Sequence, residues 1–423
     1  MNFPPTFLFG AATAAHQVEG GNSNSDYWAQ ELMTHTSFHE PSGDAVDHYH
    51  RYAEDIALLA EAGLNAYRFS IEWARIEPEE GRFDEAALGH YRDVLRVCRE
   101  HGVTPVVTLH HFTSPKWLIA KGGWESESTV GYFARYAEYI ARELGDELGY
   151  VCTINEANMG LQIAAIAKRY IKQLLFGGKK EKNTAQVGLN LRQMLANMKG
   201  GRAENLAVFG TENPQTFVSQ RSAAGDLLIM RAHEAARDAM KAVCPDLKIG
   251  LTLSLHDVQA APGGEKAAAK VWDEEFRHYL PYIQNDDFLG VQNYTRTVIG
   301  RRGPLPNPAD AELTQMGYEF YPEALANVLR KVAEDFRGEL VVTENGLGTA
   351  DDSRRVEFIR RALEGVRGCL EDGLPVRGYF HWSLLDNFEW QKGFAMTFGL
   401  IAVDRSTMER LPKPSLRFLG SQR

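Results

Sequence analysis

Eight short apolar runs, separated by longer segments with helical spacing, constrain the fold of this 423-residue sequence more than any other feature. The runs cover residues 7–12, 65–71, 104–111, 150–156, 248–253, 287–294, 339–346 and 376–382. Apolar residues recur at helical spacing over 46–62, 85–101, 128–144, 223–243 and 352–371. Alternating strands and helices predict a parallel sheet, and eight such units predict a single (β/α)8 TIM barrel that takes in residues 1–423.

A doubly wound open sheet is the competing α/β architecture. It usually carries a glycine-rich phosphate turn after its first strand, and no such turn follows residues 7–12. With 44% hydrophobic residues, the chain can bury one large core. The closed barrel is therefore the preferred fold.

The charges and the cysteines of the sequence limit which partners and which cellular compartment are expected. A net charge of -10 without a basic stripe argues against nucleic acid. No apolar block follows Met1–Pro5, so we expect neither a signal peptide nor a membrane span. The four cysteines are far apart and lack metal-site spacing, which predicts reduced thiols in a cytoplasmic protein and no metal. Assembly into a homo-oligomer stays open.

Polar and aromatic side chains stand where the apolar runs end. In a parallel barrel all strand carboxyl ends meet at one mouth, so these side chains should face a shared pocket. They are Gln17, Arg68, His110, His111, Asn155, Glu156, Tyr294, Glu344 and Trp382.

Two of these residues are glutamates at the ends of separate strands. The run Leu340–Val342 should be buried and should hold the Glu344 carboxylate at the mouth, with Asn345-Gly346 closing the strand in a turn. Glu156 ends the run 150–156 in the same way. A single glutamate beside Asn-Gly is usually solvated, but two at separate strand ends indicate a shared site. Paired carboxyls in an aromatic-lined pocket are typical of glycosidic cleavage.

This chemistry needs one ionised and one protonated carboxyl. The Arg68 guanidinium and the Tyr294 phenol should keep Glu344 ionised as the nucleophile, so that its negative charge makes Glu156 hold a proton. Aromatic faces such as Trp382 and Trp390 suit the apolar face of a pyranose.

At these residues the sequence resembles glycoside hydrolase family 1, the β-glucosidase family. Thr153-Ile154-Asn155-Glu156 resembles its acid/base motif, and Val342-Thr343-Glu344-Asn345-Gly346 resembles its nucleophile motif. Further similar segments are Phe7–Gly10, Gln17–Gly20, Tyr67–Ser70, Leu109–His111, Gly122–Trp124 and Trp382–Trp390.

The resemblance implies a retaining mechanism with Glu156 as acid/base and Glu344 as nucleophile, their carboxyl groups about 5–5.5 Å apart. It implies no cofactor. It also implies that the sugar is held by Gln17, His111, Asn155, Glu389 and Trp390, with Trp382 stacked beneath it and Tyr294 touching the nucleophile.

The sequence departs from the family pattern at several places. Ala157 follows the acid/base where proline is usual, and Phe112-Thr113-Ser114 replaces Trp-Asp-Leu. Gln292-Asn293-Tyr294 replaces Asn-Tyr-Tyr, so that Gln292 takes the place of the amide. Residues 161–222 are atypical, and we expect them to form either a mobile lid or a helical excursion over the mouth.

Glu389 should accept hydrogen bonds from distal sugar hydroxyls and repel a phosphate there. The predicted substrate is therefore an unphosphorylated terminal β-glucoside, β-galactoside or β-fucoside, free or in an oligosaccharide. Two alternatives stay open: a transglycosidase, with an acceptor site built by residues 161–222, and a non-catalytic sugar-binding barrel. The latter would be expected to lack one of the two carboxylates.

Overall fold

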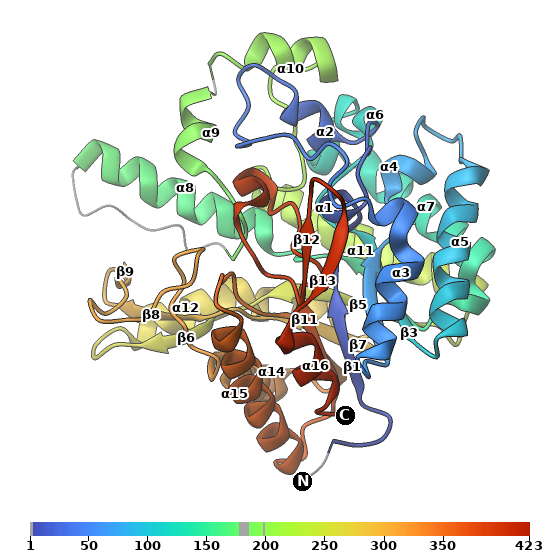
Figure 1. The fold of residues 1–423 in the computed structure, drawn as a ribbon. Coiled ribbons are helices and arrows are strands. Elements are labelled where there is room, and N and C mark those ends of the chain that lie inside the picture. Colours follow the sequence, from blue (N-terminus) through green and yellow to red (C-terminus); the bar gives the residue numbers. More distant parts are fainter. Residues whose placement is uncertain (1–2, 177–185, 198) are drawn as a thin grey trace.

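Eight parallel strands close into a barrel in the computed structural model, which describes residues 3–176, 186–197 and 199–423 (Figure 1). Around the barrel the strands follow the order β1, β2, β3, β4, β5, β7, β10 and β11, and β11 pairs with β1. Their bounds are Leu8–Ala12, Ala66–Ser70, Thr104–His110, Tyr150–Ile154, Lys248–Ser254, Phe288–Gln292, Glu339–Asn345 and Val376–Trp382. The predicted (β/α)8 barrel is confirmed, and the bounds of each apolar run agree with those of one strand to within two residues.

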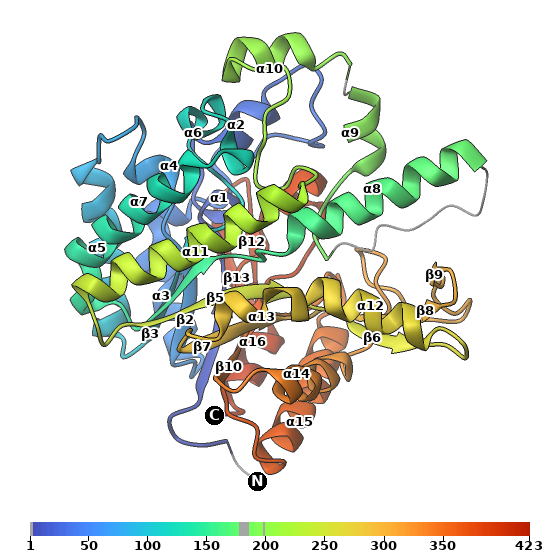
Figure 2. The ribbon, with the colours of Figure 1, turned by 180° about the vertical axis from the view of Figure 1, so that it is seen from behind.

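Helices cover the outside of the barrel (Figures 1 and 2). The longer ones are α3 (His48–Glu61), α5 (Glu85–Glu100), α7 (Ser128–Leu144), α11 (Ala223–Val243), α12 (Glu265–Glu275), α14 (Ala324–Asp335), α15 (Asp352–Glu371) and α16 (Pro414–Gly420). The shorter ones are α1 (Ala15–Val18), α2 (Asp26–Glu31), α4 (Trp73–Ile76), α6 (Lys116–Ala120), α13 (Leu280–Ile283), η1 (Gly123–Glu125), η2 (Gly145–Glu147), η3 (Arg277–Tyr279) and η4 (Trp390–Ala395). The five helical segments expected from the sequence match α3, α5, α7, α11 and α15 to within two residues at each end.

The barrel strands are apolar because both of their faces are covered. Every residue in them is buried except Arg377 and four first positions, Thr104, Tyr150, Lys248 and Glu339. A strand with two covered faces loses the alternation of polar and apolar residues and becomes a continuous apolar run. This is why these strands stand out in the sequence.

The expected turn at Asn345-Gly346 is wrong. Asn345 is the last residue of β10, its side chain accepts a hydrogen bond from the Tyr379 hydroxyl (2.9 Å), and no turn is assigned after it. A Cβ on Gly346 would lie 2.1 Å from the carbonyl oxygen of Trp382. Gly346 is needed because two backbones meet there, and not because the chain reverses.

Two small sheets outside the barrel were not expected from the sequence. One pairs β12 (Ile401–Asp404) with β13 (Glu409–Pro412), and the other joins β6 (Asp257–Ala260), β8 (Arg296–Gly300) and β9 (Gly303–Pro304). Their strands are short and partly exposed. Such strands do not produce an apolar run that a sequence reading would detect.

The atypical stretch after β4 contains three helices: α8 (Met159–Phe176), α9 (Leu191–Asn197) and α10 (Arg202–Phe209). They lie together beyond the end of the barrel that carries α1 and α2, while both chain termini lie at the other end (Figures 1 and 2). Residues 177–185, which belong to the same stretch, lie outside the described residues. Its predicted role at the mouth stays a prediction.

Three global features concern only the described part of the chain. None of its helices is long and apolar enough to cross a membrane. No group of three or more His, Cys, Asp or Glu side chains there could hold a metal ion. All four cysteines are free thiols, and three of them are buried.

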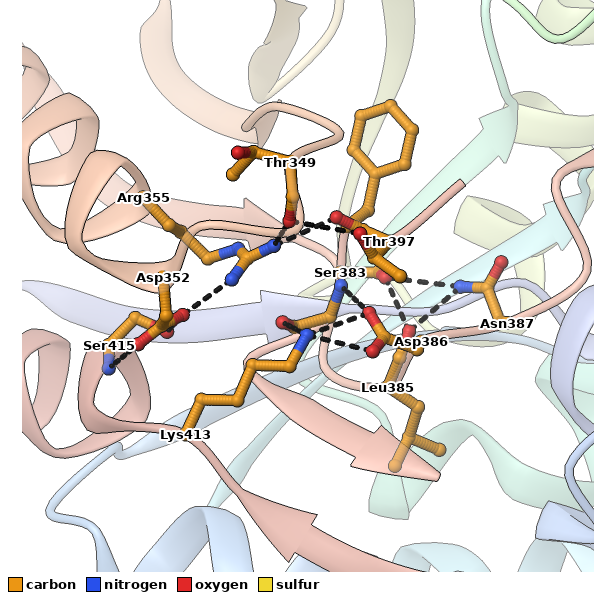
Figure 3. Close-up of polar contacts among 12 residues, drawn as sticks. Thr349, Asp352, Arg355, Ser383, Leu385, Asp386, Asn387, Thr397, Lys413 and Ser415 are labelled. Atoms are coloured by element: carbon orange, nitrogen blue, oxygen red, sulfur yellow. Dashed lines mark hydrogen bonds and ion pairs between the residues drawn. The ribbon is translucent and has the colours of Figure 1, made fainter. Parts of the chain in front are cut away.

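Polar contacts anchor the loop that follows β11 (Figure 3). The Lys413 ammonium donates to both carboxylate oxygens of Asp386 (2.9 and 2.8 Å) and to the carbonyl oxygen of Gly399 (2.8 Å). Asn387 donates to the Ser383 hydroxyl (3.1 Å) and to the carbonyl oxygen of Leu385 (3.1 Å). These contacts fix the backbone from which Glu389 and Trp390 project.

We predict that Lys413→Met lowers the free energy of unfolding by about 2–3 kcal/mol, because Asp386 then keeps a partly buried charge without its cation. Both side chains of this pair are less than a fifth exposed. Chemical denaturation would measure the loss. The control is Lys270→Met, which removes an exposed pair with Glu274 and should cost less than about 0.5 kcal/mol. Equal effects of the two variants would contradict the anchoring role of Lys413.

Candidate active site

The two glutamates predicted to react lie at the carboxyl ends of β4 and β10. Glu156 follows β4 by two residues, and Glu344 is the second-last residue of β10. The pairing of β10 with β7 shifts register between Val342 and Glu344. Irregularities of this kind are common next to active sites, where they re-aim side chains. Both glutamates are at most 3% exposed.

The Glu344 carboxylate is held by three donors. Arg68 Nη1 donates to Oε1 (2.6 Å), the Tyr294 hydroxyl to Oε2 (2.5 Å) and Gln292 Nε2 to Oε1 (3.0 Å). Burial raises the pKa of Glu344, while the Arg68 charge and the Tyr294 hydroxyl oppose that rise. The predicted contacts of Arg68 and Tyr294 with this carboxylate are present in the structure.

Glu156 has a different environment. Burial and the Glu344 charge raise the pKa of Glu156 well above its usual range, and Arg68 and the Ser254 hydroxyl only partly oppose this. One carboxyl oxygen, Oε2, is buried without a hydrogen-bond partner among the described residues. The Glu156 side chain therefore favours its protonated form more strongly than Glu344 does.

The backbone of Glu156 has a left-handed conformation, with φ of 45°. Its N–H donates to the Thr252 hydroxyl (2.8 Å) and its carbonyl oxygen accepts from the N–H of Met159 (2.9 Å). A left-handed backbone is unfavourable for a residue with a side chain, by about 1–3 kcal/mol, and persists only where the surroundings hold it. These bonds fix the direction of the carboxyl.

Asn155 lies at the centre of the polar network between the two carboxyls. Its Oδ1 accepts from Arg68 Nη2 (2.6 Å) and from Gln292 Nε2 (2.7 Å). Its amide nitrogen lies 3.1 Å from Nε2 of His111. Burial lowers the pKa of His111 well below its usual value, so the ring is neutral and Nε2 accepts this bond, which leaves the ring proton on Nδ1.

The predicted sugar-binding residues gather beside this network. Gln17 donates to the carbonyl oxygen of Phe388 (2.8 Å) and lies 3.5 Å from Oε2 of Glu389. The centroid of the His111 ring lies 5.7 Å from that of Trp382 and 5.9 Å from that of Trp390. The structure thus places all of the predicted binding residues around one buried centre.

Glu389 is a third buried carboxyl whose pKa is raised. Burial and the Glu344 charge raise the pKa of Glu389 to about 8, against donors from Trp382, Gln17 and the backbone of Gly188. The groups of Trp382, Gln17 and Gly188 that face Glu389 are hydrogen-bond donors, so the Glu389 oxygens act as acceptors. The Gly188 contact comes from the stretch between α8 and α9, within the residues 161–222 that the sequence analysis expected over the mouth.

Some residues of the site were missed by sequence reasoning. Thr252 and Ser254 project from the end of β5, where the rule of polar strand ends could have found them. Gln292 was noticed only as a replacement, although it binds both Glu344 and Asn155. Phe112 is another replacement, and the centroid of its ring lies 5.1 Å from that of Trp390.

Comparison with known proteins gives consistent matches along the chain. The family model described as glycosyl hydrolase family 1 matches residues 1–205 and 282–422. Beta-glucosidase A of Thermotoga maritima is 29% identical over 470 aligned positions, covering 98% of this chain and 96% of the relative. The beta-glucosidase of an Agrobacterium strain is 30% identical and covers 98% of this chain and 93% of the relative.

Solved structures agree with the sequence matches. The crystal structure of beta-glycosidase BGL167 is 48% identical, with a TM-score of 0.86 and coverage of 99% of this chain and 96% of that one. The structure of beta-glucosidase 1317 is 44% identical, with a TM-score of 0.88 and coverage of 98% and 97%. With its closed barrel and two differently held glutamates at the strand ends, the chain belongs to glycosyl hydrolase family 1.

Proposed function

We propose that this protein is a retaining, exo-acting β-glucosidase that hydrolyses terminal, unphosphorylated β-D-glycosyl residues. The observation that carries the proposal is that two buried carboxyls differ in their hydrogen-bond partners and in their pKa. Arg68 and Tyr294 donate hydrogen bonds to the Glu344 carboxylate. Glu156, in contrast, has a carboxyl oxygen without a partner among the described residues and a pKa raised well above its usual range. This is the division that a nucleophile and a general acid require.

In the first step, a Glu344 oxygen forms a bond to the anomeric carbon while the bond to the leaving oxygen breaks. Protonated Glu156 gives its proton to that oxygen, so the aglycone leaves as a neutral alcohol. Arg68 and Tyr294 keep the attacking carboxylate ionised and oriented. The product is a glycosyl ester on Glu344 with inverted anomeric configuration.

In the second step, the ester has removed the negative charge that raised the pKa of Glu156. This pKa therefore falls, and the carboxylate left by the first step takes a proton from water. The resulting hydroxide attacks the anomeric carbon, the ester bond breaks, and Glu344 is released as a carboxylate. Two inversions give net retention.

The substrate class follows from Glu389 and the surrounding rings. The oxygens of Glu389 can accept hydrogen bonds from sugar hydroxyls, and the group repels a phosphate once it is ionised, above its pKa of about 8. Beta-glucosidases are named among the relatives, and one from Bifidobacterium breve is named a bifunctional beta-D-glucosidase/beta-D-fucosidase. Glucosides are therefore the first substrates to test, followed by fucosides and galactosides.

The atypical residues 161–222 are proposed to shape the aglycone side of the site. A cavity of about 390 Å³ lies between the α2 region and α8–α10, and Gln391, next to Trp390, is part of its lining. Other lining residues include Tyr27, Gln30, Phe38, Ile163, Asn197 and Gln220. Amide and aromatic groups of this kind suit a polar ring such as a further sugar. The cytoplasmic location and the state of assembly stay predictions.

We expect an activated 2-deoxy-2-fluoro β-glucoside to label the protein once, on Glu344. The fluorine slows hydrolysis of the glycosyl ester, so the adduct accumulates and is detected by intact mass and peptide mapping. Glu344→Gln should abolish labelling, while Glu339→Gln, at the other end of the same strand, should not. An adduct on another residue would contradict the assignment of the nucleophile.

We expect Glu156→Ala to reduce kcat/KM for an alkyl β-glucoside by about 10²–10⁴-fold, and far less for a dinitrophenyl β-glucoside, whose leaving group needs no proton. The basic limb of the pH profile of kcat/KM should also vanish, because protonated Glu156 sets it. Initial rates on the two substrates across pH measure both effects. Equal losses on both substrates would rule Glu156 out as the general acid.

A further inference from the structure

Residues Gln186–Asn190, between α8 and α9, run beside the predicted sugar-binding residues, and we call them the 186–190 segment. Residues 186–189 are all buried. Oε1 of Gln186 accepts the backbone N–H of Tyr294 (2.7 Å), and Nε2 donates to the Ser254 hydroxyl (3.2 Å). The first residue of the segment is therefore bonded to the end of β5 and to the chain just after β7.

The other end of the segment is bonded to η4. The Asn190 side chain donates to the carbonyl oxygen of Gln391 (2.6 Å) and accepts from the Lys392 ammonium (2.7 Å). It also donates to the carbonyl oxygen of Ser37 (2.9 Å). Two backbone bonds add to these: the Asn190 N–H donates to Oε1 of Gln391 (2.6 Å), and the Gln391 N–H donates to the carbonyl oxygen of Gly188 (3.0 Å). Asn190 thus anchors the segment.

Between these two ends, the backbone of Gly188 packs against Glu389. A Cβ on Gly188 would lie 2.6 Å from the carbonyl oxygen of Glu389 and 3.1 Å from Oε1 of its carboxylate. Only a residue without a side chain can come this close. Glu389 is the residue predicted to accept hydrogen bonds from distal sugar hydroxyls, so Gly188 occupies space next to a carboxylate that a sugar needs.

The predicted catalytic and sugar-binding residues are almost completely buried in this arrangement. None of them is more than 5% exposed, and they are Gln17, His111, Asn155, Glu156, Tyr294, Glu344, Trp382, Glu389 and Trp390. The cavity of about 390 Å³ is lined by Gln391 but by neither reacting glutamate. A pyranose has to touch both glutamates, so part of this cover must move before a substrate binds. The 186–190 segment is bonded to both sides of the site and belongs to this cover.

The polar groups of the site are not all satisfied while the segment is in place. Oε1 of Gln17, Oε2 of Glu156 and Oε1 of Gln292 are buried without a hydrogen-bond partner among the described residues. Buried polar atoms without a partner are unfavourable. Sugar hydroxyls are donors that can satisfy such oxygens, and this gain would offset the bonds that the segment loses when it leaves.

We propose that the 186–190 segment is an autoinhibitory plug, which a β-glycoside must displace to reach Glu344. This inference rests on the proposed function, because it names what the substrate expels from the same site. The segment exchanges between a docked and a displaced position, and only protein with the displaced segment binds substrate. The observed kcat/KM is then the intrinsic value multiplied by the displaced fraction.

The test is to weaken the docked position, which raises activity if the segment is a plug and lowers it if the segment is a wall of the pocket. Asn190→Leu removes three side-chain bonds. We expect it to raise kcat/KM for an aryl β-glucoside by about 3–10-fold, the equivalent of about one net hydrogen bond. The gain should lie in KM with kcat unchanged, because saturating substrate has already displaced the plug.

Gly188→Ala tests the same idea by a different route, because its methyl group does not fit against Glu389. It should change KM in the same direction as Asn190→Leu. The matched control is Gln193→Leu in α9, whose exposed amide donates to Oδ1 of Asn197 (3.3 Å) on the same helix. This control should leave KM where it is. An unchanged or lower kcat/KM in the folded Asn190→Leu and Gly188→Ala variants, or an equal gain in Gln193→Leu, would overturn the proposal.

Chemical modification separates this inference from the proposed function. A carbodiimide with glycine ethyl ester converts accessible carboxyls into amides, so its rate on Glu389, followed by peptide mapping, reports displacement of the plug without any turnover. Faster modification in Asn190→Leu and Gly188→Ala than in the parent protein supports the plug even if aryl β-glucosides are not cleaved. Cleavage of the glucoside with equal modification rates would leave the β-glucosidase assignment intact and exclude the plug.

Discussion

The ion pair between Arg68 and Glu344 is the interaction on which the site depends. Arg68 is completely buried and binds residues of two other strand ends, Glu344 on β10 and Asn155 after β4. A buried guanidinium without such partners would be strongly destabilising, so the mouth of the barrel can close only when both are in place. Formation of the fold and formation of the nucleophile's environment are in this sense the same event.

From this pair the division of labour between the carboxyls follows. The side chains of Arg68, Tyr294 and Gln292 all donate hydrogen bonds to the Glu344 carboxylate. Glu156 faces the resulting charge with a strained backbone and few donors of its own. The same residue type thus acquires two different proton affinities from the positions of its neighbours.

The barrel and the catalytic pair could be predicted from the sequence because each rests on a local signal. Strands covered on both faces appear as apolar runs, and Glu156 and Glu344 stand at the ends of two of them. The turn at Asn345-Gly346 was predicted wrongly, since the close approach to Trp382 that requires Gly346 comes from another strand. The hydrogen bond from the Tyr294 N–H to Gln186 Oε1 could not be predicted, because nothing in the sequence pairs two residues that are 108 positions apart.

The burial of Glu156, Glu344 and Glu389 also governs how the resting protein responds to its medium. Each carboxyl has a folded-state pKa above its value in the unfolded chain, so the folded state binds more protons. The contribution of these three carboxyls to the free energy of unfolding therefore falls as pH rises from about 4.5, and for Glu389 until about pH 8. Once glycosylated, Glu344 carries no charge and this penalty is relieved. The same ester leaves the buried Arg68 guanidinium without its carboxylate partner, so the covalent intermediate loses the ion pair on which the site depends at the moment when the Glu344 pH dependence disappears.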